Sequence, residues 1–504
     1  DYDNIRQTCY GSYFVTHPKD KDSLYFTFTF DKIQYVFKRI YYYHQTGLEI
    51  FSTNNKTYYF NFKNASTRNS VYDSIKTKIN QKNKMNVDTV ISKWKKYEIS
   101  NMELLMWLNV FGGRSYNDIG QYPVLPWVLS NNNKEEINEK DLEDKTLYRD
   151  LSLPLGMITS NDNGERKDGY IFNLRVTTEV YEQKMKERKN GEKNDDIDLF
   201  EKPYNYGSHY SNPFYVSHFL TRIYPFSYIM IELQGNRFDD PDRLFLSFNG
   251  SYMCATTQKG DVRELIPEIY CVPEIYHNIN NFDMGIRRNK EKVRDVLCPI
   301  WTKNDSYKLI TYLNLAFESN EVSFNINNWI DLIFGYKQRG KEAEKANNVY
   351  MFNCYSDLVN IEKMNQEKKK YYYRFVEFGS CPRQLFKKQF EKREKLTGYK
   401  QIIDKDVSVI TMALKSSVNE GETNIIKQMI EKHKIIKMFP TPRKSAKFLY
   451  SDFTGLELKQ NKVNENTYIY EQNIIIYGYG IKYEKYFLGN NRITDNPPAV
   501  MYGK

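Results

Sequence analysis

One short segment of the sequence places hydroxyl groups beside an imidazole, a combination that could support nucleophilic hydrolysis. In residues 207–211, Gly-Ser-His-Tyr-Ser, Ser208 and Ser211 flank His209. The segment does not fit the G-x-S-x-G nucleophile elbow, and no adjacent carboxylate is available to orient the imidazole. We therefore expect these side chains to cap a helix and pack in the core, and hydrolysis through His209 is the minor alternative.

The other histidines, cysteines and glycines lack the spacing of metal, catalytic or phosphate sites. None of the six histidines forms an H-E-x-x-H motif or a zinc-like pattern with cysteine. Residues 112–115, Gly-Gly-Arg-Ser, lack the lysine that a phosphate-binding loop requires. The sequence therefore predicts no catalytic residue, no metal and no cofactor, and we expect a protein that is not an enzyme.

The composition indicates a folded chain of several domains. The 504 residues are 40% hydrophobic and 15% aromatic, which excludes a largely disordered protein. The net charge of +10 is spread over interspersed charges of both signs, so we expect no nucleic-acid partner, while a weak attraction to anionic lipid stays open. No stretch reaches the roughly 18 apolar residues of a membrane span. Six separated cysteines indicate reduced thiols and a cytoplasmic location.

Residues 1–80 have the pattern of a small barrel of strands closed by one helix. Apolar residues alternate along 24–30 and 33–37, as in half-buried strands, and strands 48–51 and 58–62 flank an Asn-containing turn. Asn64 is placed to cap the helix that follows. The polar residues 81–87 are expected to be a linker.

Beyond the linker the pattern changes to helices separated by long aromatic-rich segments. Residues 100–103, Ser-Asn-Met-Glu, have the form of a capping box for a helix that ends at Gly112. Ser211 is expected to cap a helix that stops at Pro225. We further expect helices at 309–317, 326–334 and 424–438, mobile surface loops at 131–147 and 182–198, and strands at 467–483.

Residues 329–340, Trp-Ile-Asp-Leu-Ile-Phe-Gly-Tyr-Lys-Gln-Arg-Gly, closely resemble the hallmark string of the BEACH domain of beige/Chediak–Higashi and neurobeachin proteins. Other blocks that resemble the family follow in the same order at 98–106, 113–118, 121–129, 203–211, 235–243, 261–268 and 378–386. The resemblance extends over about residues 88–393.

The resemblance implies an α+β fold, in which a pleckstrin-homology-like (PH-like) β-barrel with a C-terminal helix packs on a mainly helical, irregular BEACH domain. It implies a PH-like domain at 1–80 whose first strands are not evident, a linker at 81–87 and a BEACH domain at 88–393. Residues 394–504 are then a connector that leads toward a WD-repeat propeller.

Polar and aromatic residues of the BEACH-like blocks are the candidate site residues. The favoured role is to satisfy buried backbone in an irregular core, and the alternative is to line a partner-binding groove between the two domains. These residues are Arg114, Tyr116, Asn117, Asp118, Tyr122, Trp127, Tyr206, His209, Arg237, Asp242, Arg243, Glu264, Trp329, Lys337 and Arg339.

The resemblance also implies a function, namely a non-enzymatic scaffold for vesicle and membrane traffic in lysosome-related organelles, autophagy, and membrane fusion or fission. The expected partners are proteins of trafficking or scaffold complexes, with weak peripheral membrane association. The expected location is the cytoplasm and the membrane periphery. The alternative is a structural subunit fixed in a cytoskeletal or ciliary assembly, which the charged insertions and the tyrosine-rich composition also fit.

The short linker predicts a close contact between the first two domains, because a short tether gives a high effective concentration. We expect the aromatic strand residues Tyr35, Phe37 and Tyr41–Tyr43 to pack onto the segment 114–127 or its neighbours. Interfaces of this kind favour tyrosine and arginine over lysine and glutamate.

Overall fold

The computed structural model describes the chain from residue 29 to residue 393 with short gaps, and a few strands beyond. The described ranges are 29–53, 57–79, 84–130, 134–138, 140–158, 164–189, 202–223, 226–393, and strands between 456 and 502. The strand expected at 24–28 and the helix expected at 424–438 lie outside these residues.

The N-terminal part is a three-stranded antiparallel sheet with one helix. The strands β1 (Ile33–Tyr41), β2 (His44–Ser52) and β3 (Thr57–Asn61) are paired in the order β1-β2-β3. Asn64 caps α2 (Ala65–Lys78) by accepting a hydrogen bond from the Thr67 N–H at 2.8 Å, as expected. Phe30, expected in a strand, lies instead in a 3₁₀ turn, because the Lys32 N–H closes the turn on the Thr29 carbonyl.

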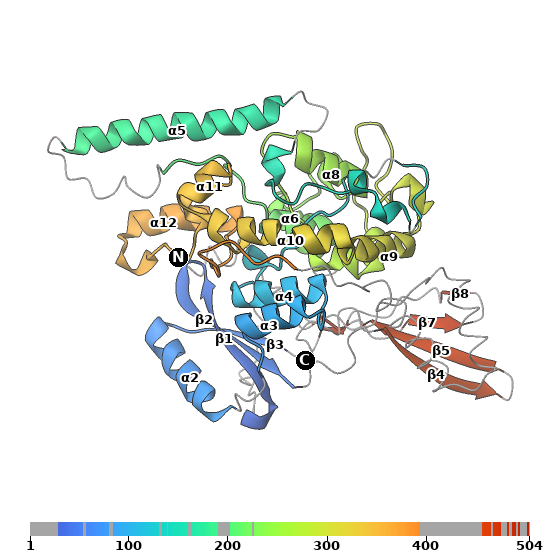
Figure 1. The fold of residues 1–504 in the computed structure, drawn as a ribbon. Coiled ribbons are helices and arrows are strands. Elements are labelled where there is room, and N and C mark those ends of the chain that lie inside the picture. Colours follow the sequence, from blue (N-terminus) through green and yellow to red (C-terminus); the bar gives the residue numbers. More distant parts are fainter. Residues whose placement is uncertain are drawn as a thin grey trace.

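Side chains alternate across this sheet, and both of its faces are buried. Val36 and Ile50 pack with Ile75 of α2 on one face. Tyr35 and Phe51, one position away in each strand, point to the other face and join the large core of the helical region. The expected alternation of strand 33–37 is present, and its second face packs on the helical region. Figure 1 shows the reason, since α2 lies on one side of the sheet and helices α3 (Val87–Lys95) and α4 (Asn101–Phe111) lie on the other.

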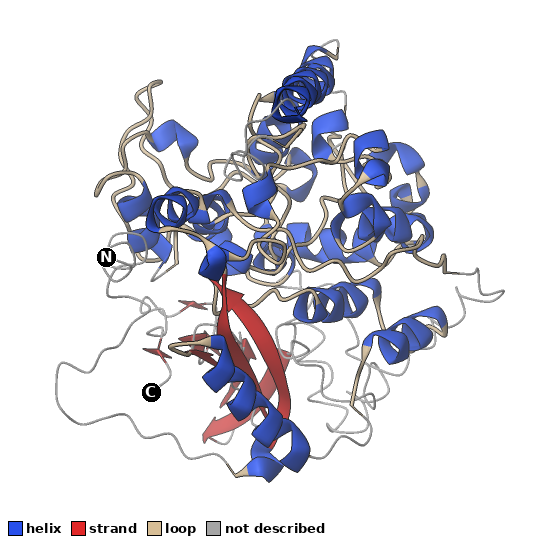
Figure 2. Cartoon of the chain, turned by 90° about the vertical axis from the view of Figure 1, so that its left-hand side faces the viewer, coloured by secondary structure: helices blue, strands red, loops and turns tan. Residues whose placement is uncertain are grey.

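The helical region is a single body to which the sheet and α2 are attached at one edge (Figure 1 and Figure 2). Its remaining helices are α5 (Glu165–Lys189), α6 (Pro213–Leu220), α7 (Phe226–Leu233), α8 (Phe248–Thr257), α9 (Ser306–Phe317), α10 (Asn320–Ile333), α11 (Lys341–Lys345) and α12 (Gln366–Arg374). The positions of α4, α9 and α10 confirm the helices expected from apolar spacing. Ser100 caps α4 by accepting from the Glu103 N–H at 3.0 Å, which is the first half of the expected capping box.

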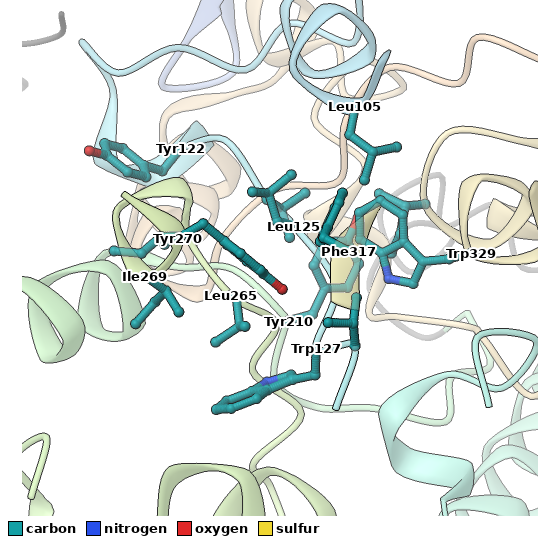
Figure 3. Packing of buried hydrophobic residues seen from close by; sticks show 14 of the residues in the cluster. Leu105, Tyr122, Leu125, Trp127, Tyr210, Leu265, Ile269, Tyr270, Phe317 and Trp329 are labelled. Carbon is teal, nitrogen blue, oxygen red and sulfur yellow. The ribbon is translucent and has the colours of Figure 1, made fainter. Parts of the chain in front are cut away.

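The core of the helical region is rich in large aromatic side chains. All five tryptophans of the chain, Trp94, Trp107, Trp127, Trp301 and Trp329, are fully buried. Figure 3 shows Trp127 and Trp329 among Leu125, Leu265, Tyr270 and Phe317, which come from segments far apart in the sequence.

Much of the buried backbone between the helices belongs to no sheet, and side chains supply its hydrogen bonds. The Arg166 guanidinium, 2% exposed, donates to five carbonyl oxygens, among them that of Asp261 at 2.6 Å. Arg222 donates in the same way to the carbonyls of Phe245 and Arg294 at 2.8 and 2.6 Å. Arg166 and Arg222, neither of which is among the candidate residues, therefore supply hydrogen bonds to this irregular backbone.

The end of the helical region returns to its beginning. The Arg393 guanidinium lies over the Tyr97 ring at 3.6 Å and the Trp94 ring at 5.2 Å, and it donates to the Ile99 carbonyl at 3.0 Å. The Phe390 ring centroid lies 5.8 Å from that of Trp94. We call these contacts the terminal clasp, because they join residues 390–393 to the end of α3 and to the residues just after it.

Two expectations about helix α6 and the segment before α5 are wrong. The cap of α6 is Asn212, which accepts from the Tyr215 N–H at 2.8 Å, and Pro213 occupies the first helical position, where a missing N–H has no cost. The helix ends at Leu220, ahead of Pro225.

In the segment 134–147, Ile137, Leu142 and Leu147 are buried, and these evenly spaced apolar residues anchor what was expected to be a mobile loop.

Helix α5 also corrects an expectation, because residues 182–189 belong to it and are not a loop. Lysine, glutamate, glutamine and methionine in this stretch are strong helix formers, and Gln183 donates to Glu187 one turn away at 3.0 Å. The first half of α5 is anchored by Asn173, whose amide donates to the Asn205 carbonyl at 3.0 Å. Figure 1 shows α5 along the outer edge of the helical body.

The described strands beyond residue 456 form two small sheets. One has the order β4-β5-β7-β8, with β4 (Leu456–Asn464), β5 (Thr467–Ile474), β7 (Tyr486–Gly489) and β8 (Arg492–Ile493), and the other pairs β6 (Ile481–Lys482) with β9 (Met501–Tyr502). β5 and β6 confirm strands within the range 467–483. A connection to a propeller stays a prediction.

Candidate partner-binding interface

Aromatic rings from the sheet and from α4 form the centre of the contact between the two parts. The Tyr35 ring meets the Trp107 ring edge-on at 5.5 Å, and Phe37 meets Phe111 in the same way at 6.1 Å. Trp107 and Phe111 are themselves stacked at 5.5 Å along one face of α4. Edge-to-face pairs of this kind stabilise a contact beyond their burial of area.

A buried ion pair lies beside these rings and is shared between the two parts. Arg39 Nε donates to Glu49 Oε2 at 2.7 Å, and the two side chains are 2% and 1% exposed. Arg39 Nη1 also donates to the Val110 carbonyl at 2.7 Å, in the last turn of α4, where the helix dipole favours a cation. Glu49 Oε1 accepts from Ser115 Oγ at 2.6 Å and Asn117 Nδ2 at 3.0 Å. Each charge therefore depends on the helical region for its remaining hydrogen bonds.

Further polar contacts involve the linker and the segment after α4. The Gln121 amide donates to the Ile40 carbonyl at 2.6 Å and to Asp118 at 3.1 Å. The Met85 N–H, within the expected linker, donates to the Tyr35 hydroxyl at 3.1 Å. The predicted contact between the sheet and the 114–127 segment is thus confirmed for Ser115, Asn117 and Gln121, and the aromatic part of it is made by the neighbouring α4.

The turn between β1 and β2 inserts two tyrosines into the helical region. Tyr42 and Tyr43 link paired residues Tyr41 and His44 and have φ values of 49° and 66°. Two-residue hairpin turns with positive φ at both positions normally use Asn-Gly, since a larger side chain strains the backbone there. Burial compensates here, because Tyr43 is 6% exposed and its ring meets that of Tyr372 at 5.3 Å.

One edge of this contact reaches solvent. His44 Nδ1 lies 2.5 Å from Glu362 Oε1, and His44 Nε2 lies 2.8 Å from the Tyr373 hydroxyl. The Glu362 side chain is 63% exposed and that of His44 is 18% exposed. We call His44, Glu362 and Tyr373 the interface rim, since both parts of the molecule contribute to it.

Most of the candidate site residues lie in the core and not at this interface. Glu264, 4% exposed, accepts from Arg149 Nη1 at 2.8 Å, from the Trp127 N–H at 3.2 Å and from Trp329 Nε1 at 3.0 Å. Arg149 was not a candidate. Four chain segments therefore meet at one buried carboxylate. Contacts of this kind fit a role in the core for Glu264, Trp127 and Trp329.

The other buried candidates also have packing roles. The Tyr122 hydroxyl donates to Glu268, and the Tyr116 and Tyr122 rings meet edge-on at 5.2 Å. The Tyr206 hydroxyl donates to the Asn347 carbonyl at 2.7 Å. Burial lowers the pKa of Arg114, whose guanidinium lies near Tyr210 and Cys381.

Asn117 and Asp118 are the candidates that lie at the interface. The Asn117 amide donates to Glu49 and to the Thr57 hydroxyl of β3, each at 3.0 Å. Asp118 accepts from the Gly120 N–H at 2.9 Å and orients Gln121, and burial raises the pKa of Asp118.

Five further candidates lie apart from the interface contacts. Arg237 and Arg243 are 80% and 69% exposed and pair only loosely with nearby aspartates. Asp242 pairs with Arg287 at 3.1 Å. Lys337 is half-buried, and Arg339 pairs with Asp357 at 3.2 Å. The structure thus does not bring the fifteen candidates together into one site.

His209 has no access to solvent. It contacts the Ser211 carbonyl through Nδ1 at 2.8 Å and Cys381 Sγ through Nε2 at 3.2 Å, whereas the Ser208 hydroxyl donates to the Gly260 carbonyl. Burial, with Arg114 nearby, holds the pKa of His209 well below its usual range, and burial raises the pKa of Cys381 to about 12. Both groups are therefore uncharged at neutral pH. Within the described part of the chain, no group of three or more histidine, cysteine or acidic residues could hold a metal ion.

Comparison with known families accounts for both parts of the molecule. Residues 92–393 match the family model described as the Beige/BEACH domain, and residues 15–76 match that of the PH domain associated with Beige/BEACH. The chain belongs to the BEACH family.

This BEACH chain is also similar to much longer curated proteins. It is 37% identical over 366 residues to the lysosomal-trafficking regulator of Homo sapiens and 35% identical over 350 residues to the protein of the same name in Drosophila melanogaster. These alignments cover 72% and 69% of the chain but only 9% of each relative. No described helix of the BEACH chain is long and apolar enough to cross a membrane.

Proposed function

We propose that this chain is the PH–BEACH unit of a non-enzymatic scaffold that binds protein partners in vesicle and membrane traffic. The names of the human and Drosophila relatives support a role in traffic to lysosomes or related organelles. We place the protein in the cytoplasm and at the membrane periphery.

The observation that carries the proposal is the shared interface between the sheet and the BEACH helices. The Arg39–Glu49 pair and the Tyr35–Trp107 contact bury polar and aromatic groups from both parts together. A closed interface holds the exposed residues of both parts in one arrangement, and such preorganisation lowers the entropic cost of binding a partner. The interface rim is the place where a partner could contact both parts at once.

The state of the His209–Cys381 pair supports the non-enzymatic part of the proposal. A nucleophilic cysteine needs a thiolate and access to its substrate, whereas burial favours the neutral thiol of Cys381, 3% exposed. Activity profiling of the purified chain with broad hydrolase substrates tests this, and turnover that is lost in His209→Asn would contradict it.

Charge reversal at the interface rim tests the scaffold proposal. We expect Glu362→Arg to remove specific partners in a pull-down from cytosol and membranes. Glu182→Arg, the same charge reversal on the exposed side of α5, should keep them. Identical partner sets for Glu362→Arg and the unchanged chain would show that the rim does not bind partners.

Extraction of the native protein separates this proposal from a structural subunit of a cytoskeletal or ciliary assembly. A traffic scaffold should be released by mild lysis or detergent. A fixed subunit should require high salt, because many weak contacts hold it in place.

A further inference from the structure

The three most exposed large hydrophobic side chains of the described residues lie close together in the sequence. Ile286, Ile300 and Leu297 are 65%, 64% and 61% exposed. The next, Phe172 at 56% and Leu358 at 50%, lie in other parts of the chain. Single exposed apolar residues are common in soluble proteins, but three within one short segment call for an explanation. We call residues 283–303 the exposed loop.

The exposed loop is folded and firmly attached. Ile286 is paired with Lys292 across a small hairpin, in which the Arg287 N–H donates to the Glu291 carbonyl at 2.8 Å. Directly opposed residues point to the same side, so Ile286 and Lys292 share a face. The Phe248 N–H donates to the Leu297 carbonyl at 3.0 Å and fixes the next part of the loop to the start of α8.

Buried residues alternate with the exposed ones and hold them in place. Val293, Val296 and Trp301 are at most 2% exposed. Leu297 directly follows Val296, and Ile300 directly precedes Trp301. Three residues of chain can separate Leu297 from Ile300 by at most about 10 Å. The apolar side chains therefore project from a rigid base.

Basic residues outnumber acidic ones in the exposed loop. The loop contains six lysines and arginines against three acidic residues. Arg287, Arg288 and Lys292 form ion pairs with Asp242, Asp240 and Asp283. The other basic residues, Lys290, Arg294 and Lys303, are exposed and in no ion pair with any residue that the structure describes.

We propose that the exposed loop is a membrane-contact surface, in which Ile286, Leu297 and Ile300 enter the interfacial layer of an anionic membrane and the neighbouring cations bind lipid headgroups. Aliphatic side chains beside lysine and arginine are the pattern of interfacial membrane binding. Lysine is depleted at protein–protein interfaces, so Lys290, Lys292 and Lys303 favour a lipid surface over a protein partner. The inference rests on the proposed function in one respect: it assigns the proposed membrane association to a specific surface of the chain.

Flotation of the purified 504-residue chain with lipid vesicles tests the inference. We expect the chain to float with vesicles of phosphatidylcholine and phosphatidylserine, less so at high salt, and not with phosphatidylcholine alone. The triple variant Ile286→Ser, Leu297→Ser, Ile300→Ser should reduce the bound fraction by about tenfold or more. The reason is that three aliphatic side chains no longer enter the membrane, so their transfer free energy is lost. Phe172→Ser with Leu358→Ser is the matched control and should bind like the unchanged chain.

A second triple variant tests the charges. Lys290→Glu, Arg294→Glu and Lys303→Glu together should also reduce binding by about tenfold or more, because each cation near an anionic surface adds to the attraction. All substituted side chains are exposed, and unchanged thermal unfolding will show that the variants fold.

Three results would overturn the inference: no flotation of the unchanged chain, equal flotation with neutral vesicles, or unchanged flotation of the serine variant. If the chain does not float and the serine variant loses partners in a pull-down, the surface binds protein instead. The vesicle experiment contains no partner, so its failure is distinct from failure of the scaffold proposal, which depends on Glu362→Arg.

Discussion

Arg39 on β1 and Glu49 on β2 form an ion pair that is closed off from water by the BEACH helices on one side and the sheet on the other. Removing one partner leaves a buried charge without compensation, which costs about 3–5 kcal/mol. We therefore expect Arg39→Met to lower the free energy of unfolding in urea by about this amount.

The double variant Arg39→Met, Glu49→Leu should recover much of that loss, because no unpaired charge remains. Arg243→Met, at a position that is 69% exposed, should change stability by less than about 0.5 kcal/mol. A loss for Arg39→Met as small as that of Arg243→Met would mean that the pair does not hold the two parts together.

Tyr43 contributes in two opposing ways, through a favourable buried ring and a strained backbone. Tyr43→Ala should destabilise the chain by about 3–5 kcal/mol, as for other large aromatic-to-alanine changes. Tyr43→Gly should be about 1 kcal/mol more stable than Tyr43→Ala, because glycine adopts the φ of 66° without strain. Urea unfolding of the two variants measures this difference. If Tyr43→Ala is the more stable of the two, as alanine usually is relative to glycine, the turn is not strained.

Burial raises the pKa of Glu268 to about 7, and this predicts a pH-dependent stability. In the unfolded chain a glutamate titrates near about 4.3. Between these values the folded chain binds more protons, so the free energy of unfolding decreases as the pH rises from about 4.3 to about 7. Glu268→Gln should therefore be up to about 4 kcal/mol more stable than the unchanged chain at about pH 8, and similar to it at about pH 4.

The control for this prediction is Glu344→Gln, on the exposed surface of α11, which should leave the pH profile unchanged. Some dependence will remain in Glu268→Gln, because burial also raises the pKa of Glu103 to about 7. Urea unfolding at several pH values gives the free energy of unfolding as a function of pH. If this dependence is the same with and without Glu268, the carboxyl of Glu268 is charged in the folded chain, and the prediction is contradicted.

Two glycines should respond to alanine in opposite directions. Gly379 has a φ of 90°, and an added Cβ would lie 2.0 Å from the Ser211 carbonyl oxygen, so Gly379→Ala should destabilise the chain by more than about 3 kcal/mol. Gly169 lies within α5 with no atom near an added Cβ, and Gly169→Ala should stabilise the chain by up to about 1 kcal/mol. Thermal unfolding of both variants measures the contrast, and a shift in the same direction would contradict it.

Local signals in the sequence predicted the elements whose ends or faces they control directly. Asn64 and Ser100 cap helices as expected, and apolar spacing located α9 and α10. The turn at Tyr42 and Tyr43 had no such signal, since tyrosines adopt positive φ there only because the helical region buries them. Tertiary contacts decide such positions, and a single sequence does not display them.

The candidate interface shows the same limit. Asn117 and Asp118 were found through the family resemblance, and the aromatic strand residues through their alternation. Arg39 and Glu49 were missed because strand register decides which charges meet across a sheet. Arg149, the ion partner of Glu264, lies 115 positions from it in the sequence, within no recognisable motif.

The terminal clasp has a mechanical consequence for the domain that it closes. Arg393 and Phe390 hold the exit of the BEACH domain against Trp94 and Tyr97, which lie next to its entrance. A pulling force applied at residues 84 and 393 would act on these side chains first, because they join the two ends of the domain to each other. The domain would then resist separation of its two ends, and its contact with the sheet would stay undisturbed.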